Sequence, residues 1–261
     1  MATEQSRAEP QGTAVSQAAE KRYFVPLENN PEVMTSLTHK LGLSPSLQFH
    51  DVWSIDDPDL LAFVPRPAYA LLLVFPVNET FAKFRAEEDK DKPEYSGSGE
   101  DEDVVWYKQT IGNACGLMGL LHGVSNGAAR AQIQSGSDLD TFIQTAIPLT
   151  PKERATLIEQ TEALKTAHAA AASLGDTDAP AADADVDLHY VCFVKSEKNG
   201  HLYEMDGGRK GPLDRGELKA DEDVLSPAAL EKGVRAFLKR EEEAGGGDLR
   251  FSLIVLAESL D

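Results

Sequence analysis

One stretch of this chain, residues 104–124, constrains its fold more than any other. It begins with an apolar segment, runs through a polar loop, and continues with apolar residues at helical spacing, at Leu117, Leu120, Leu121 and Val124. Gly116 and Gly119 lie inside this predicted helix, where each glycine costs roughly 1 kcal/mol relative to alanine. Glycines in such positions usually mark close packing or the approach of another backbone. The stretch therefore predicts a helix that follows a loop and packs tightly in the core.

The first turn of this helix carries a cysteine. Asn113 occupies the position expected for the N-cap, so Cys115 falls in the first turn. Unpaired backbone N–H groups and the positive end of the helix dipole favour a thiolate there, and the same amides can face an oxyanion. Gln109 brings a side-chain amide that could donate to that oxyanion as the loop turns back. The alternative is that Cys115 is a small buried hydrophobic residue, the commonest role of a free cysteine.

Length and composition indicate a soluble globular protein. At 261 residues, with 41% hydrophobic and 26% charged residues, the chain can build one domain with a substantial core, and a second compact domain is not required. The net charge of −19 argues against a nucleic-acid partner and favours a basic one. The two cysteines, Cys115 and Cys192, are too few for a disulfide framework and fit a reducing compartment. We predict no cofactor and no metal.

The ends of the chain and its longest apolar run bound the cellular context. Residues 1–22 have no apolar core, so they are not a secretory signal, and we predict a disordered tail there. The run 68–75 is too short to span a membrane and predicts a buried strand. We therefore expect a single domain at 23–261 in a protein that is cytoplasmic, or also nuclear, and does not bind membranes.

Hydrophobic periodicity and turn residues predict a mixture of helices and strands. Helices are expected at 29–41, 57–63, 78–85, 115–126, 139–146, 151–164 and 227–243, and strands at 48–52, 69–75, 188–194, 201–206 and 249–257. No β-α unit repeats, so the fold class is α+β. Two stretches are predicted to be loops. Residues 86–103 form a solvated, mobile acidic loop, and residues 167–186 form a long connection that is either functional or disordered.

A histidine and an aspartate are predicted to meet at one end of a hairpin. A turn near residues 198–200 brings His189, at the start of one strand, and Asp206, at the end of the next, to the same open end. Their relative face stays undecided, because one residue in the turn changes the register. Six histidines compete for the role of a base. His122 is two helical turns from Cys115, more than ~10 Å along the axis, and is predicted to be a buried structural residue. The others are predicted on the N-terminal elements, in the 167–186 loop or in the hairpin turn, at His39, His50, His168 and His201.

These residues resemble the motifs of a known enzyme family. The pattern Gln109, Asn113, Ala114, Cys115, Gly116, Leu120, Leu121 and His122 is similar to the active-site signature of the ubiquitin carboxyl-terminal hydrolases (UCH), which are papain-like cysteine peptidases. Residues 187–190 and 200–207 resemble the family's histidine and aspartate motifs. Further similarity at 25–33 and 248–252 extends the resemblance over roughly 23–257, as in the short, single-domain members. One departure is Gly123, where the family usually has serine or alanine.

The resemblance implies a fold and a reaction. The implied fold is α/β/α, with a central antiparallel sheet flanked by helices and a knotted backbone whose 167–186 segment crosses over the active site and limits the size of the leaving group. The implied reaction is hydrolysis at the C-terminal glycine of ubiquitin through a thioester, with Cys115, His189, Asp206 and Gln109 as catalytic residues. The resemblance also implies substrate-binding positions at Glu28, Glu32, Asp51 and Leu188.

The resemblance leaves the modifier and the activity open. A ubiquitin-like modifier such as NEDD8 is a possible second substrate. The alternative from another functional class is a non-catalytic protein that binds and shields free ubiquitin. We expect a monomer in either case.

Overall fold

The computed structural model describes residues 22–243, 248 and 250–260. The predicted tail therefore lies outside the described residues, apart from Arg22. Within the described part, the chain forms one antiparallel sheet in the strand order β1-β6-β2-β3-β4-β5. The strands are β1 (Leu47–Asp51), β2 (Ala70–Pro76), β3 (Leu188–Lys195), β4 (His201–Met205), β5 (Leu213–Glu217) and β6 (Ser252–Glu258).

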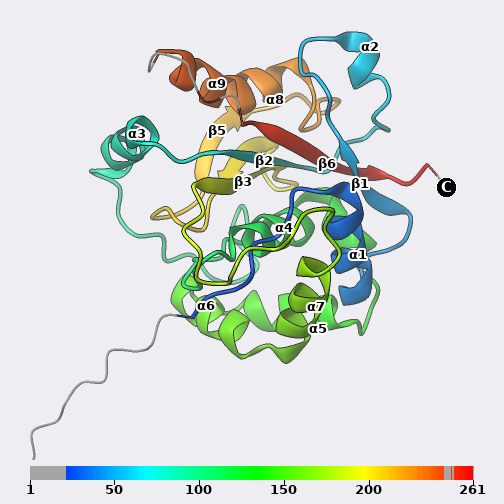
Figure 1. Ribbon diagram of the computed structural model, residues 1–261. Helices are drawn as coiled ribbons and strands as arrows, with labels where there is room; N and C mark the ends of the chain where they lie inside the picture. The colour runs from blue at the N-terminus through cyan, green and yellow to red at the C-terminus, as the bar shows by residue number, and fades with distance from the viewer. Residues whose placement is uncertain (1–21, 244–247, 249, 261) are drawn as a thin grey trace, which may run out of the picture.

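Helices cover both faces of this sheet (Figure 1). One layer contains α1 (Pro31–Leu41), α4 (Cys115–Ser125), the 3₁₀ turn η1 (Gly127–Gln132), α5 (Asp138–Ala146), α6 (Pro151–Gln160) and α7 (Glu162–Ala172). The opposite side holds α2 (Pro58–Leu61), α3 (Glu79–Asp89), α8 (Pro227–Lys232) and α9 (Val234–Glu243). The predicted α/β/α arrangement around an antiparallel sheet is confirmed. The knotted path stays a prediction.

Strand β2 connects the two hydrophobic cores. All seven of its residues are buried, as expected for a strand covered on both faces. Alternate side chains point to opposite faces, so Leu72 and Val74 join the core under α4 while Leu71 and Leu73 join the core under α8 and α9. The apolar run at 68–75 is therefore a central strand, as the sequence predicts.

Helix α4 packs closely on the sheet through its glycines. A methyl group added at Gly123 would lie 3.0 Å from the Ala70 Cβ and 3.5 Å from the Cys192 sulfur. One added at Gly116 would lie 3.1 Å from the Leu27 Cβ. The predicted close approach is confirmed, and at Gly123 it brings α4 directly onto β2 and β3.

Several predicted boundaries are wrong. The helix predicted at 151–164 is two helices, because Thr161 adopts extended dihedral angles between α6 and α7. The helix predicted at 227–243 is likewise broken, at Gly233, whose ψ is −97°. Helix α3 continues to Asp89 and α7 to Ala172, so both predicted loops begin later than expected. Strand β5 was not predicted.

The acidic stretch 86–103 is also less solvated than predicted. Asp89 and Glu102 are both buried. Arg209 binds the Asp89 carboxylate through Nε and Nη2, and Arg154, itself fully buried, donates to the Glu102 carboxylate. The negative charge of the stretch predicted that its acidic residues are exposed. Asp89 and Glu102 are instead buried, because each is paired with a buried arginine. None of the helices in the described part of the chain is long and apolar enough to cross a bilayer.

Candidate active site

Cys115 lies in the first turn of α4, as predicted, and is its first residue, but the turn before it differs. The N-cap is Ala114, which has no capping side chain. Asn113 instead adopts a left-handed conformation with φ of 57°. Its amide points away from the helix and donates to the carbonyls of Ala182 and Ala184, at 2.8 and 2.9 Å. The prediction that Asn113 caps α4 is therefore wrong, because the positive φ directs its side chain to another segment.

His189 and Asp206 meet as the hairpin geometry predicts. His189 is the second residue of β3, and Asp206 directly follows β4. The His189 Nε2 lies 2.8 Å from Asp206 Oδ1, with the histidine side chain 14% exposed and the aspartate side chain fully buried. The pairing of Cys192 with Met205 sets the register, which the sequence had left open. Because Nε2 is engaged by the carboxylate, Nδ1 is the ring nitrogen available to a third group.

That third group is the thiol of Cys115. The His189 ring and the backbone at Tyr190 and Gly116 lie close enough to its sulfur to lower the pKa of the thiol. Burial raises the pKa of the thiol, but His189 and these backbone groups together outweigh burial, so the net pKa is lowered. Burial lowers the pKa of His189, whereas the Asp206 charge raises it, giving a pKa of about 10. At neutral pH the arrangement therefore favours a thiolate beside an imidazolium.

The Asp206 carboxylate is held as an anion. Burial alone would raise its pKa, but the charge and hydrogen bond of His189 lower it to about 2. The backbone N–H of Gly208 donates to Oδ1 at 2.8 Å, and Arg85 of α3 places Nη1 3.8 Å from Oδ2. Sequence reasoning did not identify Arg85. It lies on an exposed helix and no motif marks it.

Gln109 lies beside the turn that follows Asp206, and its side chain is hydrogen-bonded within its own loop. Its backbone N–H donates to the Gly207 carbonyl at 2.9 Å, and a methyl group at Gly207 would lie only 3.0 Å from the Gln109 Cβ. The side-chain Nε2 donates to the Ile111 carbonyl at 3.1 Å, while Oε1 is buried and has no hydrogen-bond partner among the described residues. In this state the amide is therefore next to the site but bound to its own loop.

The remaining histidines make contacts away from the thiol. His39, His50 and His168 each bond to a backbone carbonyl, those of Leu47, Glu258 and Val25. His201 bonds to Asp214 and begins β4 instead of lying in the turn. His168 lies in α7 and is buried, which corrects its predicted loop position. His122 is fully buried in α4, as predicted.

The four predicted substrate-binding residues lie on separate elements. Glu28 is in the N-terminal segment and accepts from the Thr177 backbone and hydroxyl, at 3.3 and 3.2 Å. Glu32 is exposed in the first turn of α1. Asp51 ends β1, where burial raises its pKa. Leu188 begins β3 directly before His189 and packs on the core.

The connection between α7 and β3 passes close to the cysteine turn (Figure 1). Residues 173–187 form it, and contacts with Asn30, Glu28 and Asn113 hold it. Tyr23 of the N-terminal segment pairs with Gly112 of the same turn. The turn before Cys115 therefore contacts both the N-terminal segment and this connection.

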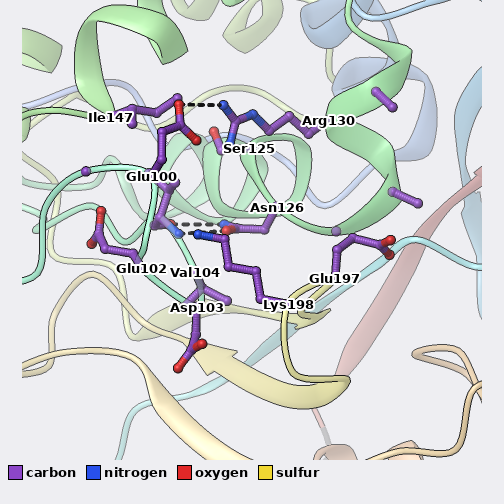
Figure 2. A pocket seen from close by; sticks show the side chains of 15 residues that line it. Glu100, Glu102, Asp103, Val104, Ser125, Asn126, Arg130, Ile147, Glu197 and Lys198 are labelled. Atoms are coloured by element: carbon purple, nitrogen blue, oxygen red, sulfur yellow. Dashed lines mark hydrogen bonds and ion pairs between the residues drawn. The ribbon is translucent and has the colours of Figure 1, made fainter.

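A cavity of about 510 Å³ lies at the opposite end of α4 (Figure 2). Asn126 crosses it to bond with the backbone of Val105 at 2.7 and 2.9 Å, and Arg130 pairs with Glu100 at 3.8 Å. Ser125, the last residue of α4, lines it, whereas Cys115 begins the same helix. This cavity is therefore separate from the thiol. No group of three or more potential metal ligands occurs among residues the structure describes.

The family described as "Ubiquitin carboxyl-terminal hydrolase, family 1" matches residues 24–239. The chain belongs to this family. Among its relatives are ubiquitin carboxyl-terminal hydrolase 3 of Arabidopsis thaliana, 37% identical over 93% of this chain and 97% of the relative, and YUH1 of Saccharomyces cerevisiae, 36% identical over 87% and 93%. The predicted UCH resemblance is confirmed, and the chain is a cysteine peptidase.

The solved structures agree with this family at the level of the fold. The catalytic domain of UCH37 from Trichinella spiralis, bound to ubiquitin vinyl methyl ester, matches with a TM-score of 0.68 and covers 92% of this chain and 97% of its own. Sequence identity in that comparison is 20%. The UCH fold is therefore shared although most residues differ.

Proposed function

We propose that this UCH-family chain hydrolyses bonds at the C-terminal glycine of ubiquitin, with Cys115 as the nucleophile. The observation that carries the proposal is the series Cys115, His189 and Asp206, in which His189 Nε2 lies 2.8 Å from the Asp206 carboxylate and the His189 ring lowers the pKa of the Cys115 thiol. Such a series supplies a thiolate, a proton carrier and a group that orients the carrier. The names of the relatives and the ubiquitin adduct in the solved structure support ubiquitin as the substrate.

The proposed reaction has two steps. The Cys115 thiolate attacks the carbonyl carbon of the terminal glycine, and His189 donates its Nδ1 proton to the leaving amine as the bond to the carbonyl breaks. A thioester between Cys115 and ubiquitin results. Water then attacks the thioester carbonyl while His189 accepts a proton from it, and the thiolate leaves. Asp206 holds the ring so that Nδ1 faces the sulfur throughout.

The oxyanion formed in each step needs donors. The backbone N–H of Cys115 lies at the unpaired end of α4, where a helix supplies such groups. Gln109 would be the second donor, and its Nε2 would exchange the Ile111 carbonyl for the oxyanion when substrate binds. The unpartnered Oε1 supports this exchange, because the side chain is not held at both ends.

The substrate would approach along the N-terminal half of the chain. Leu188 lies next to His189 and would contact the tail of ubiquitin close to the scissile bond. Glu28, Glu32 and Asp51 would pair with arginines of that tail. Residues 173–187 would lie over the path of the leaving group, so small adducts and unfolded extensions would pass while folded proteins would not.

The test is release of a fluorophore from the C-terminus of ubiquitin. Cys115→Ala should lower kcat/KM by at least about a thousandfold, whereas the matched change Cys192→Ala should not, because burial raises the pKa of that thiol and keeps it inactive. A parallel assay with a NEDD8-like modifier ranks the two substrates. Tight ubiquitin binding by the wild type without release would instead support the non-catalytic binding protein.

A further inference from the structure

The side chain of Asn113 joins the cysteine turn to the connection between α7 and β3. Its Nδ2 donates to two carbonyls of that connection, Ala182 at 2.8 Å and Ala184 at 2.9 Å. Both donor hydrogens of the amide are therefore used on one segment. Asn113 lies two residues before Cys115, so the contact joins the proposed nucleophile's turn directly to the segment that would limit the leaving group.

The contact of Asn113 lies within residues 173–187, whereas the other contacts of this connection described here lie closer to its two ends. Near the start, Asp176 accepts from Asn30 at 3.1 Å and Thr177 bonds to Glu28. At the end, the Asp187 carbonyl accepts from the backbone of Val77. Residues 181–184 form a turn, closed by the Ala184 N–H and the Ala181 carbonyl at 3.0 Å. Asn113, two residues before Cys115, therefore binds this turn through its side-chain amide.

The left-handed backbone explains why asparagine suits the position. A φ of 57° is costly for most residues, but asparagine, aspartate and glycine adopt it more readily. Of these, only asparagine carries two side-chain hydrogens that can be donated to carbonyls. Backbone conformation and side-chain contact can therefore be separated by substitution, which makes the position unusually testable.

We propose that Asn113 is a positioning residue that latches the connection 173–187 closed and thereby sets the largest leaving group the enzyme releases. The inference rests on the proposed function, since it names what determines the size limit of that reaction. Two hydrogen bonds of ordinary strength correspond to about 30-fold in an equilibrium between closed and open connection. Loss of the latch should raise the open population by that factor.

The experiment compares Asn113→Gly and Asn113→Asp with the wild type. Glycine keeps the positive φ and removes both donors, whereas aspartate keeps the shape and points negative oxygens at two carbonyls. Asn199→Gly is the matched control, because the Asn199 amide donates to the Tyr203 hydroxyl in the β3–β4 hairpin and not to the connection. Limited proteolysis within residues 173–187, without substrate, measures opening directly. Cleavage should accelerate about 30-fold in Asn113→Gly, at least as much in Asn113→Asp, and not in the control.

The second measurement uses two ubiquitin fusions, one with a short peptide and one with a small folded domain after the terminal glycine. The ratio of folded-domain to peptide cleavage should rise at least tenfold in Asn113→Gly. Unchanged proteolysis would overturn the latch. An equal fall in cleavage of both fusions would overturn it too, because Asn113 would then act on the cysteine turn alone. A wild type inactive on both fusions would reject the proposed function, while the proteolysis would still decide whether Asn113 holds the connection.

Discussion

His122 makes the stability of the protein depend on pH at the scale of a single residue. It is fully buried, and its Nε2 accepts the backbone N–H of Tyr107 at 3.0 Å, which requires that nitrogen to be unprotonated. Burial lowers the pKa of His122 to about 4. The unfolded chain would take up this proton near pH 6.5, so the contribution is complete above about pH 6.5 and is lost as pH falls toward 4. The loss amounts to up to about 3 kcal/mol.

Urea unfolding at pH 7, 5.5 and 4.5 tests whether protonation of His122 destabilises the protein. A His122→Gln variant can still accept from Tyr107 but cannot titrate, so it should lose less stability than the wild type over that interval. Parallel curves for the two proteins would show that the acid sensitivity arises elsewhere.

The residues of the candidate site were predictable to different degrees. Cys115, His189 and Asp206 were placed from a helix start and a hairpin end, and the structure brings them together. The orientation of Gln109 and the use of Asn113 were not predictable. Each depends on which carbonyl of a distant or neighbouring loop comes within reach, and sequence spacing carries no such information.

At the scale of the element, the glycines of α4 differ in what they permit. A methyl group at Gly119 would meet its nearest neighbour at 3.7 Å, an ordinary contact, whereas one at Gly123 would meet the Ala70 Cβ at 3.0 Å. Gly119→Ala should therefore stabilise the protein by about 0.5–1 kcal/mol through higher helix propensity. Gly123→Ala should gain nothing or lose up to about 1 kcal/mol, because α4 must shift from β2. Thermal unfolding of both variants measures the difference, and equal gains would contradict the close packing.

Element existence was predictable and element boundaries were less so. Apolar periodicity located α1, α4 and β2, because the residues that these elements bury are the apolar residues of their own sequences. The breaks at Thr161 and Gly233 were missed, since the periodic pattern continues across each of them. Strand β5 was missed for the opposite reason. Its sequence, Leu213–Glu217, has four polar or glycine residues and gains its order from pairing with β4.

At the scale of the whole molecule, a buried ion pair ties the acidic stretch to the helical layer. The Arg154 guanidinium donates to Glu102 and to the carbonyls of Trp106, Ala146 and Ile147. Arg154→Met should lower the free energy of unfolding by about 3–5 kcal/mol, because it leaves a carboxylate buried without its partner.

The surface pair of Arg130 and Glu100 supplies the control, since Arg130→Met should cost less than about 1 kcal/mol. The double change Arg154→Met with Glu102→Leu should recover part of the loss, because no unpaired charge remains. Urea denaturation measures all three variants. A loss in Arg154→Met no larger than that of the surface control would mean that Glu102 finds other solvation.

The strand order sets how the sheet can be completed as the protein is made. β1 and β2 are consecutive strands, yet they do not pair, because β6 lies between them. Until residues 252–258 leave the ribosome, β1 and the edge of β2 that pairs with β6 have no strand to pair with, because β6 is synthesised long after both. Cys115 also emerges well before His189 and Asp206, so a nascent chain carries an ordinary, unactivated thiol. The Cys115 thiol can therefore acquire its lowered pKa only after the segment that carries His189 and Asp206 has been synthesised and has folded against α4.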